Sequence, residues 1–129
     1  MVEWEVIVIV RTLVAFVSLA AASAASAQWV PGAEITGQQV QVETNGTLNT
    51  VYFESGGVAQ ISSPSGATVV NATWTADQGK ICLQTENTFD CYPYRAPFTA
   101  QVPVSLTSDC GVLSRWTALT TYIAPFERG

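Results

Sequence analysis

Between residues 35 and 119, short runs of strand-forming residues alternate with turn signals, and this pattern limits the possible folds most strongly. The runs are rich in Val, Thr, Ile and aromatic residues, which suit a pleated strand. Turn signals fall between them at residues 45–46, 55–57, 63–66, 77–79, 86–87 and 109–111. No window after residue 27 has the periodicity of an amphipathic helix. The pattern therefore predicts an all-β domain.

We expect strands at residues 35–44, 47–54, 58–62, 67–76, 80–85, 89–94, 101–107 and 112–119. Apolar residues at every second position give a strand one buried face. The residues expected to face the core are Val40 and Val42, Val51 and Phe53, Val70, Ala72 and Trp74, Ile81 and Leu83, Val102 and Val104, and Trp116 and Ala118. Every connection looks short enough for a hairpin. We therefore favour a small antiparallel meander, closed or nearly closed into a barrel of about eight strands, over a two-layer β-sandwich.

Residues 1–27 have the layout of a secretory signal peptide. Arg11 precedes an apolar stretch at 12–22, and small residues at 25–27 form the pattern that signal peptidase accepts. We therefore expect an N-terminal signal helix that is removed on export. An uncleaved membrane anchor is the alternative, because the apolar stretch is long enough to cross a bilayer.

Cleavage is expected between Ala27 and Gln28, which leaves residues 28–129 as a single all-β domain, periplasmic or secreted. The acidic start of the chain, MVEWE, does not fit the positive n-region of a signal peptide. We therefore predict that translation starts near Val10.

The charge balance disfavours two classes of partner. The chain carries five Lys and Arg against ten Asp and Glu, a net charge of −5; loss of residues 1–27 leaves four against eight, or −4. Nucleic acids and anionic membranes are both bound through basic patches, so we expect neither as a partner after signal cleavage. The acidic residues fall at turns or on the polar sides of predicted strands, where we expect them to be solvated.

Cys82 and Cys91 lie in a predicted hairpin. If residues 80–85 and 88–93 pair across the turn at 86–87, the two cysteines face each other. The Cα atoms of a non-hydrogen-bonded pair are about 4.5 Å apart, within the range that a disulfide accepts. Export favours oxidation, so we predict a Cys82–Cys91 disulfide.

Cys110 lies in a turn and is predicted to be an unpaired thiol. An intermolecular bridge and pairing with Cys91 are the alternatives. Three cysteines without a histidine do not complete a zinc site, and no Cys-x-x-Cys redox motif is present. We therefore expect neither a metal nor a cofactor.

The absence of histidine from the sequence excludes Ser-His-Asp and Cys-His catalysis. No phosphate-binding glycine motif is present either. We expect no enzymatic activity. The alternative is a carboxylate-dependent hydrolase, because two acidic groups suffice for glycoside hydrolysis.

The segment CYPYRAPF, residues 91–98, holds the candidate binding residues Tyr92, Tyr94, Arg95 and Phe98. Clusters of aromatic residues and arginine are typical of binding anchors. The alternative, which we favour, is that Tyr92 packs in the core and the other residues line one end of the barrel.

The segment from Gly66 to Tyr94 resembles a pattern in small exported proteobacterial β-domain proteins. That pattern is Gly-x-Trp, then Gly-Lys-x-Cys-Leu, then a cysteine followed by an aromatic residue. The matching residues are Trp74, Gly79, Lys80, Cys82, Leu83, Cys91 and Tyr92. Here Gly66 lies further from Trp74 than the pattern has it. The resemblance implies export and a β fold, and it implies no activity.

We therefore expect an exported, non-catalytic β-domain that binds a protein or small ligand or has a structural role. The alternative is an inhibitor of a cell-wall-degrading or proteolytic enzyme, which is a fold-level analogy. An inhibitor should present a projecting loop, at 62–66 or 95–98. A binding barrel should have an open apolar mouth, and a hydrolase should hold two carboxylates about 5–10 Å apart in a cleft.

Overall fold

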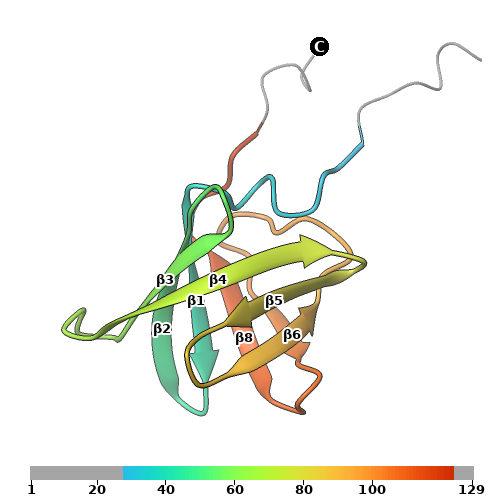
Figure 1. Ribbon diagram of the computed structural model, residues 1–129. Coiled ribbons are helices and arrows are strands. Elements are labelled where there is room, and N and C mark those ends of the chain that lie inside the picture. Colours follow the sequence, from blue (N-terminus) through green and yellow to red (C-terminus); the bar gives the residue numbers. More distant parts are fainter. Residues whose placement is uncertain (1–27, 124–129) are drawn as a thin grey trace, which may run out of the picture.

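The computed structural model describes residues 28–123, which form one antiparallel sheet of eight strands (Figure 1). The strands are β1 (Gln38–Thr44), β2 (Thr47–Phe53), β3 (Val58–Ser62), β4 (Val69–Asp77), β5 (Lys80–Gln84), β6 (Phe89–Pro93), β7 (Val104–Thr107) and β8 (Leu113–Ala118). The predicted signal helix, with the residue before the predicted cleavage site, Ala27, lies outside the described residues. No helix that could span a membrane occurs in the described part of the chain.

The sheet curls into a nearly closed barrel, in which the edge strands β6 and β7 lie against each other without pairing. The order of the strands is β6-β5-β4-β3-β2-β1-β8-β7, which leaves a seam between β6 and β7. The predicted all-β, nearly closed barrel is thus confirmed, and the two-layer sandwich is wrong.

Two of the hairpin turns follow directly from their residues. Asn45 and Gly46 have φ angles of 51° and 82°, and Gln78 and Gly79 have φ angles of 52° and 77°. Positive φ at both central residues defines the type I′ turn, whose twist matches that of the flanking strands. These two-residue turns fix the register of β1 against β2 and of β4 against β5.

The connection from β6 to β7, residues 94–103, is much longer than a hairpin, so the expectation that every connection is short is wrong here. Gln101 has a positive φ of 68°, and the amide of Val102 donates to Thr99 O in a turn. The strand therefore begins at Val104 instead of residue 101. Val102, which was predicted to face the core, lies before the strand and is exposed.

The N-terminal boundary also differs, because β1 begins at Gln38 instead of residue 35. Residues 31–37 form a series of turns that ends at Gly37, with a φ of 77°. Ile35 in this segment is fully buried. The start of the predicted strand is therefore a series of turns that packs against the barrel.

The core lies inside the barrel and follows the predicted alternation. Its buried residues include Val40, Val42, Val51, Phe53, Ala72, Ile81, Trp116 and Ala118. Val70 is an exception among the residues predicted to face inward, because it is exposed near the start of β4. The β3–β4 hairpin to which it belongs extends beyond the barrel (Figure 1).

The lower part of the seam is bridged by the turn between β7 and β8. Asp109 N donates to Cys91 O at 2.9 Å, and Cys110 N donates to the Asp90 carboxylate at 3.2 Å. Lys80 Nζ also lies 2.6 Å from the Asp109 carboxylate, but this ion pair is exposed and contributes about 1 kcal/mol at most. The backbone hydrogen bonds therefore hold this turn against β6.

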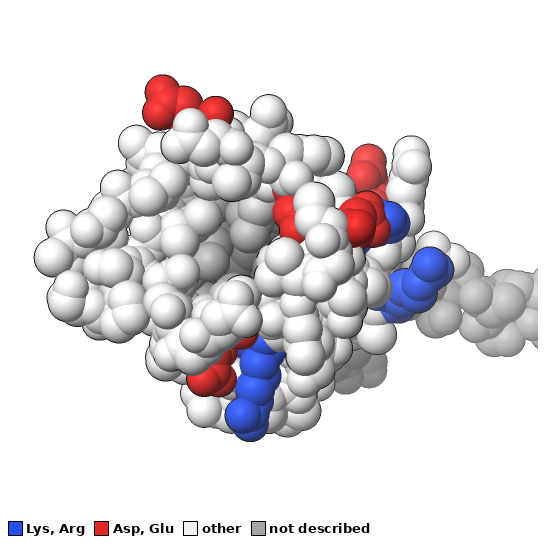
Figure 2. All heavy atoms as spheres, turned by 90° about the horizontal axis from the view of Figure 1, so that it is seen from below, with Lys and Arg blue, Asp and Glu red and all other residues white. Residues whose placement is uncertain are grey.

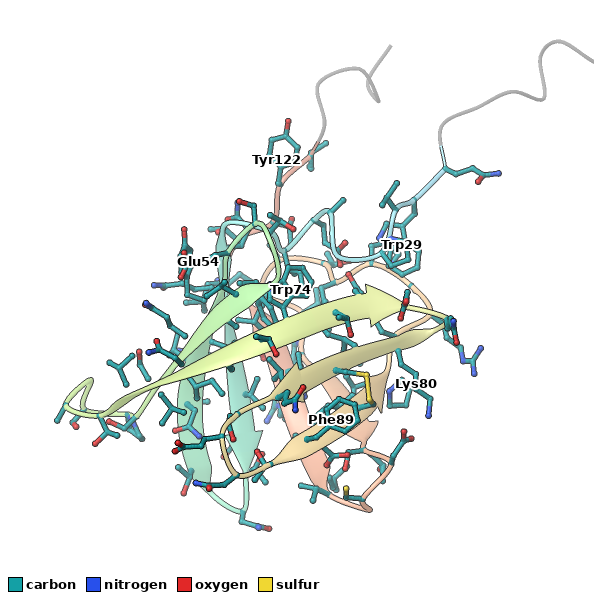
Figure 3. The ribbon with its side chains drawn as sticks, viewed as in Figure 1. Trp29, Glu54, Trp74, Lys80, Phe89 and Tyr122 are labelled. Carbon is teal, nitrogen blue, oxygen red and sulfur yellow. A yellow bond between two sulfur atoms is a disulfide. The ribbon has the colours of Figure 1, made fainter. Side chains whose placement is uncertain are left out.

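The Cys82–Cys91 disulfide is confirmed, and it joins directly paired residues of β5 and β6 whose Cα atoms are 4.0 Å apart. In Figure 3 the yellow sulfur bond lies on the face of the hairpin, near Lys80 and Phe89. Cys110 forms no disulfide and is exposed.

We predict that the double variant Cys82→Ala/Cys91→Ala loses about 2–3 kcal/mol of unfolding free energy, because the disulfide restricts the unfolded chain. Urea unfolding followed by tryptophan fluorescence measures the loss. Cys110→Ala is the matched control and should unfold at the wild-type urea concentration. Equal stability of the double variant and the control would show that the hairpin does not depend on the disulfide.

Candidate functional site

The two ends of the barrel differ. At the upper end in Figure 1, residues 28–37 cross the opening. At the lower end lie the β1–β2, β5–β6 and β7–β8 turns. Figure 2 views this lower end and shows a hollow in its middle, formed mainly by uncharged atoms. The upper end is thus covered, whereas the lower end is hollowed.

Glu34 organises the upper end. Its Oε1 accepts a hydrogen bond from Trp29 Nε1 at 3.0 Å. Its Oε2 accepts from Tyr94 OH at 2.5 Å and from Phe98 N at 2.8 Å. Glu34 is only 7% exposed, so the expectation that the acidic residues are all solvated is wrong at this position. A buried carboxylate is costly unless it is hydrogen-bonded, and three donors meet that requirement here.

Gly32 lets the N-terminal segment approach the barrel closely. Its φ is +89°, and an added Cβ would lie 3.0 Å from the ring of Trp74. Its amide donates to Tyr94 OH at 2.9 Å. Burial, together with the hydrogen bond to Glu34, raises the pKa of Tyr94, so this hydroxyl stays protonated and remains a donor to Glu34. With all of these partners, Glu34 has a structural role.

A cavity of about 180 Å³ opens at the lower end. We call it the lower mouth. Its apolar lining comprises Val42, Val51, Ile61, Leu83, Tyr92 and Trp116, and its polar lining comprises Thr44, Asn49, Thr85, Thr88 and Asp90. Thr44, Thr85 and Thr88 flank the β1–β2 and β5–β6 turns, so polar groups lie near the opening. The mouth is therefore an apolar recess with a polar rim.

Trp116 is fully buried and is the largest side chain in this lining. Its ring stacks on Phe98 at 5.8 Å between centroids and lies 5.0 Å from the ring of Tyr92. Its Nε1 is buried and has no hydrogen-bond partner within residues 28–123. A buried donor without an acceptor costs about 1–3 kcal/mol, so such groups are uncommon.

Asp90 gives the lower mouth a negative charge. Its Oδ1 accepts from Cys91 N at 2.9 Å and from Cys110 N at 3.2 Å. Partial burial acts to raise its pKa, but hydrogen bonds from Ser108, Cys110 and Cys91 outweigh burial and hold the pKa of Asp90 below its ordinary value. The carboxylate is therefore ionised at neutral pH.

The structure divides the four residues of the predicted binding cluster between two cavities: Tyr92 lines the lower mouth, whereas Tyr94, Arg95 and Phe98 together line a groove beside the seam. Tyr92 is half-buried and lines the lower mouth. Tyr94 and Phe98 are buried in the core, and Arg95 is exposed. The groove has a volume of about 290 Å³ and is lined by residues 93–98, Val104 and Leu106. Only Tyr92 therefore contributes to the lower mouth.

Sequence reasoning missed the two groups that distinguish the ends of the barrel. Glu34 looked like one of several solvated acids, although its position among apolar residues in the stretch VPGAEI is a signal for burial. Trp116 was correctly placed on the inner face, but no sequence signal shows that a cavity lies beside it. Among residues 28–123, no group of three or more His, Cys, Asp or Glu side chains could hold a metal ion.

No protein-family model, curated protein or solved structure matches the chain.

We predict that Glu34→Gln lowers the unfolding free energy by about 2 kcal/mol, because the amide group places a donor where the carboxylate accepts hydrogen bonds. Chemical denaturation measures the loss. Glu86→Gln, the same change in the exposed β5–β6 turn, should stay within about 0.5 kcal/mol of the wild type. If both variants were equally stable, Glu34 would not organise the upper end.

Proposed function

We propose that this protein is an exported, non-catalytic β-barrel domain that binds a small, mostly apolar ligand in its lower mouth. The observation that carries the proposal is the apolar recess with its polar rim at the uncovered end of the barrel. Ligand sites typically combine a largely apolar lining with a few polar groups that orient the ligand. Export rests on the predicted signal peptide.

The size of the recess limits the ligand. Pockets for drug-sized molecules have volumes of about 300–1,000 Å³. The lower mouth, at about 180 Å³, is smaller. An apolar cavity of about 150 Å³ binds benzene. A ring-sized molecule, or one side chain of a larger partner, therefore matches the available space.

The positions of two acidic residues support a non-catalytic role. Glu34 lies at the upper end with three protein donors, whereas Asp90 lies at the lower mouth and accepts from two backbone amides. A glycosidase needs its two carboxylates on either side of one bond. Because these acids lie at opposite ends of the barrel, they do not form such a pair.

Benzene titration, followed by amide chemical shifts, tests the proposal. We expect shifts at residues that line the lower mouth, and about a tenfold or greater loss of affinity in Asn49→Trp, because the indole would occupy the opening. Leu48→Trp is the matched control, because adjacent residues of β2 face opposite sides and Leu48 is exposed. Shifts elsewhere, no binding, or equal binding by both variants would contradict the proposal.

A second candidate function, enzyme inhibition, is favoured by the β3–β4 hairpin, which projects from the barrel (Figure 1). Its turn is held by hydrogen bonds from Ser63 N to Thr68 O at 2.9 Å and from Thr68 N to Ser63 Oγ at 3.1 Å. A loop already held in one conformation loses less entropy on binding. The other candidate loop, 95–98, supports this function less, because Phe98 is buried.

The inhibitor candidate is tested with lysozyme and trypsin as target enzymes. Ser62 and Val69 are directly paired, so replacing residues 63–68 by Asn-Gly gives a two-residue turn without disturbing the barrel. We expect the intact protein to slow one enzyme and the shortened hairpin to inhibit at least about tenfold less. Failure of the intact protein to slow either enzyme, or equal inhibition by both forms, would overturn this candidate.

A further inference from the structure

We infer that the domain associates with a second copy of itself through the start of β4, where residues 69–72 form an open sheet edge. The two edges pair as antiparallel strands across a two-fold axis at Val70. This interface lies outside the lower mouth and does not depend on the ligand proposed for it. It follows from the hydrogen-bond pattern of β4 and from the lack of charge along the β3–β4 hairpin.

The start of β4 extends beyond the end of β5. β3 pairs with β4 from Val69 onward, whereas the ladder between β4 and β5 reaches only as far as Thr73 and Gln84. Figure 1 shows this part of β4 at the left, with β3 on one side and no strand on the other. Within the described chain, residues 69–72 therefore have one paired side and one open side. We call the open side the free edge.

The hydrogen bonds of the β3–β4 ladder show which backbone groups face the free edge. Trp74 N donates to Gly57 O at 2.8 Å, so Trp74 is hydrogen-bonded on the side of β3. Along an antiparallel ladder, hydrogen-bonded pairs alternate with non-hydrogen-bonded pairs. Every second residue counted back from Trp74 therefore bonds to β3. The N–H and C=O groups of Val69 and Asn71 point the other way, to the free edge.

The free edge lacks the features that usually protect an exposed strand. Val69 and Val70 are exposed apolar residues, and Asn71 is exposed too. No charged residue occurs between positions 55 and 76, and Figure 2 shows the projecting left side of the molecule without charged atoms. Natural proteins protect such edges with charges, proline or a bulge, and residues 69–72 have none of these. The free edge is therefore suited to pairing with another strand.

A second copy fits the free edge because the edge is complementary to itself. With the two-fold axis at Val70, Val69 lies opposite Asn71 of the second copy, and Asn71 lies opposite Val69 of the second copy. Each of these pairs exchanges two hydrogen bonds, which satisfies the outward groups of both strands. An axis at Asn71 would instead place Val69 opposite Thr73, whose outward groups already pair with Gln84. The pairing is isologous, so it closes after two copies.

The side chains and the surface beside the free edge suit the same register. The two copies of Val70 form a non-hydrogen-bonded pair, in which Cα atoms lie about 4.5 Å apart and the apolar side chains are in contact. A depression of about 380 Å³ beside the edge is lined by residues 71–73 and 84–86. In this register Ala67 and Thr68 of the second copy lie opposite Thr73 and Ala72, over that depression. Their small, uncharged side chains match it.

Sedimentation velocity tests the inference. We expect the sedimentation coefficient of the purified protein to rise toward that of a dimer between about 10 μM and about 1 mM, because so short an edge gives reversible association. Val70→Lys should weaken dimerisation by at least about tenfold, because it places like charges opposite each other at the axis. Val58→Lys is the matched control: Val58 is 43% exposed against 41% for Val70, but both sides of β3 are paired. It should dimerise like the wild type.

A mixing experiment separates loss of the interface from loss of folding. Val70→Glu should also be monomeric, for the same reason as Val70→Lys. An equimolar mixture of the two variants should dimerise at least about tenfold more tightly than either variant alone, because opposite charges then face each other at the axis. Misfolded variants would not show this recovery.

A cross-link tests the register. In a Cys110→Ala background, Val70→Cys should form an intermolecular disulfide on mild oxidation, because directly opposed Cα atoms about 4.5 Å apart meet the geometry of the bond. Val58→Cys in the same background should not. Non-reducing electrophoresis measures both.

Four outcomes would contradict the inference. They are a protein that stays monomeric at every concentration, equal dimerisation of Val70→Lys and Val58→Lys, no recovery in the mixture, and equal cross-linking at the two positions. A monomeric protein whose free edge binds a strand of a different protein would also show that a second copy is the wrong partner.

Discussion

The cover over the upper end of the barrel depends on the buried carboxylate of Glu34. It joins the N-terminal segment, through Trp29, to Tyr94 and Phe98 in the long connection between β6 and β7. The backbone oxygen of Glu34 also accepts from the amide of Tyr122, after the last strand. These three segments lie outside the paired strands, and their hydrogen bonds to Glu34 hold them together over the upper end of the barrel.

Local signals account for the parts of this fold that could be predicted. Alternation of apolar residues, turn pairs such as Asn45-Gly46, and the spacing of Cys82 and Cys91 act over a few residues, so they specify the strands, the register of the β5–β6 hairpin and its disulfide. The seam, the burial of Glu34 and the lower mouth depend on residues far apart in sequence. Glu34 and Phe98, for example, are separated by 64 positions. No local pattern contains that information.

The two ends of the barrel use buried polar groups in opposite ways. At the upper end, the carboxylate of Glu34 is supplied with three donors. At the lower end, Trp116 lines the mouth, and its buried Nε1 has no acceptor within the described residues. In natural proteins most buried polar groups have a hydrogen-bond partner. Exceptions to such rules of folding are expected mainly at functional or strained sites. The proposed binding site thus lies at the end of the barrel where a buried polar group is left unsatisfied.

The position of the two ends of the described chain has a consequence for how the domain can be presented. Trp29 and Tyr122 both lie at the upper end (Figure 3), opposite the lower mouth. A fusion partner, an affinity tag or a membrane attachment joined to either side would therefore approach the covered end. A barrel tethered in this way would have its recess facing the surrounding solution. A ligand could reach the recess with the tether on either side.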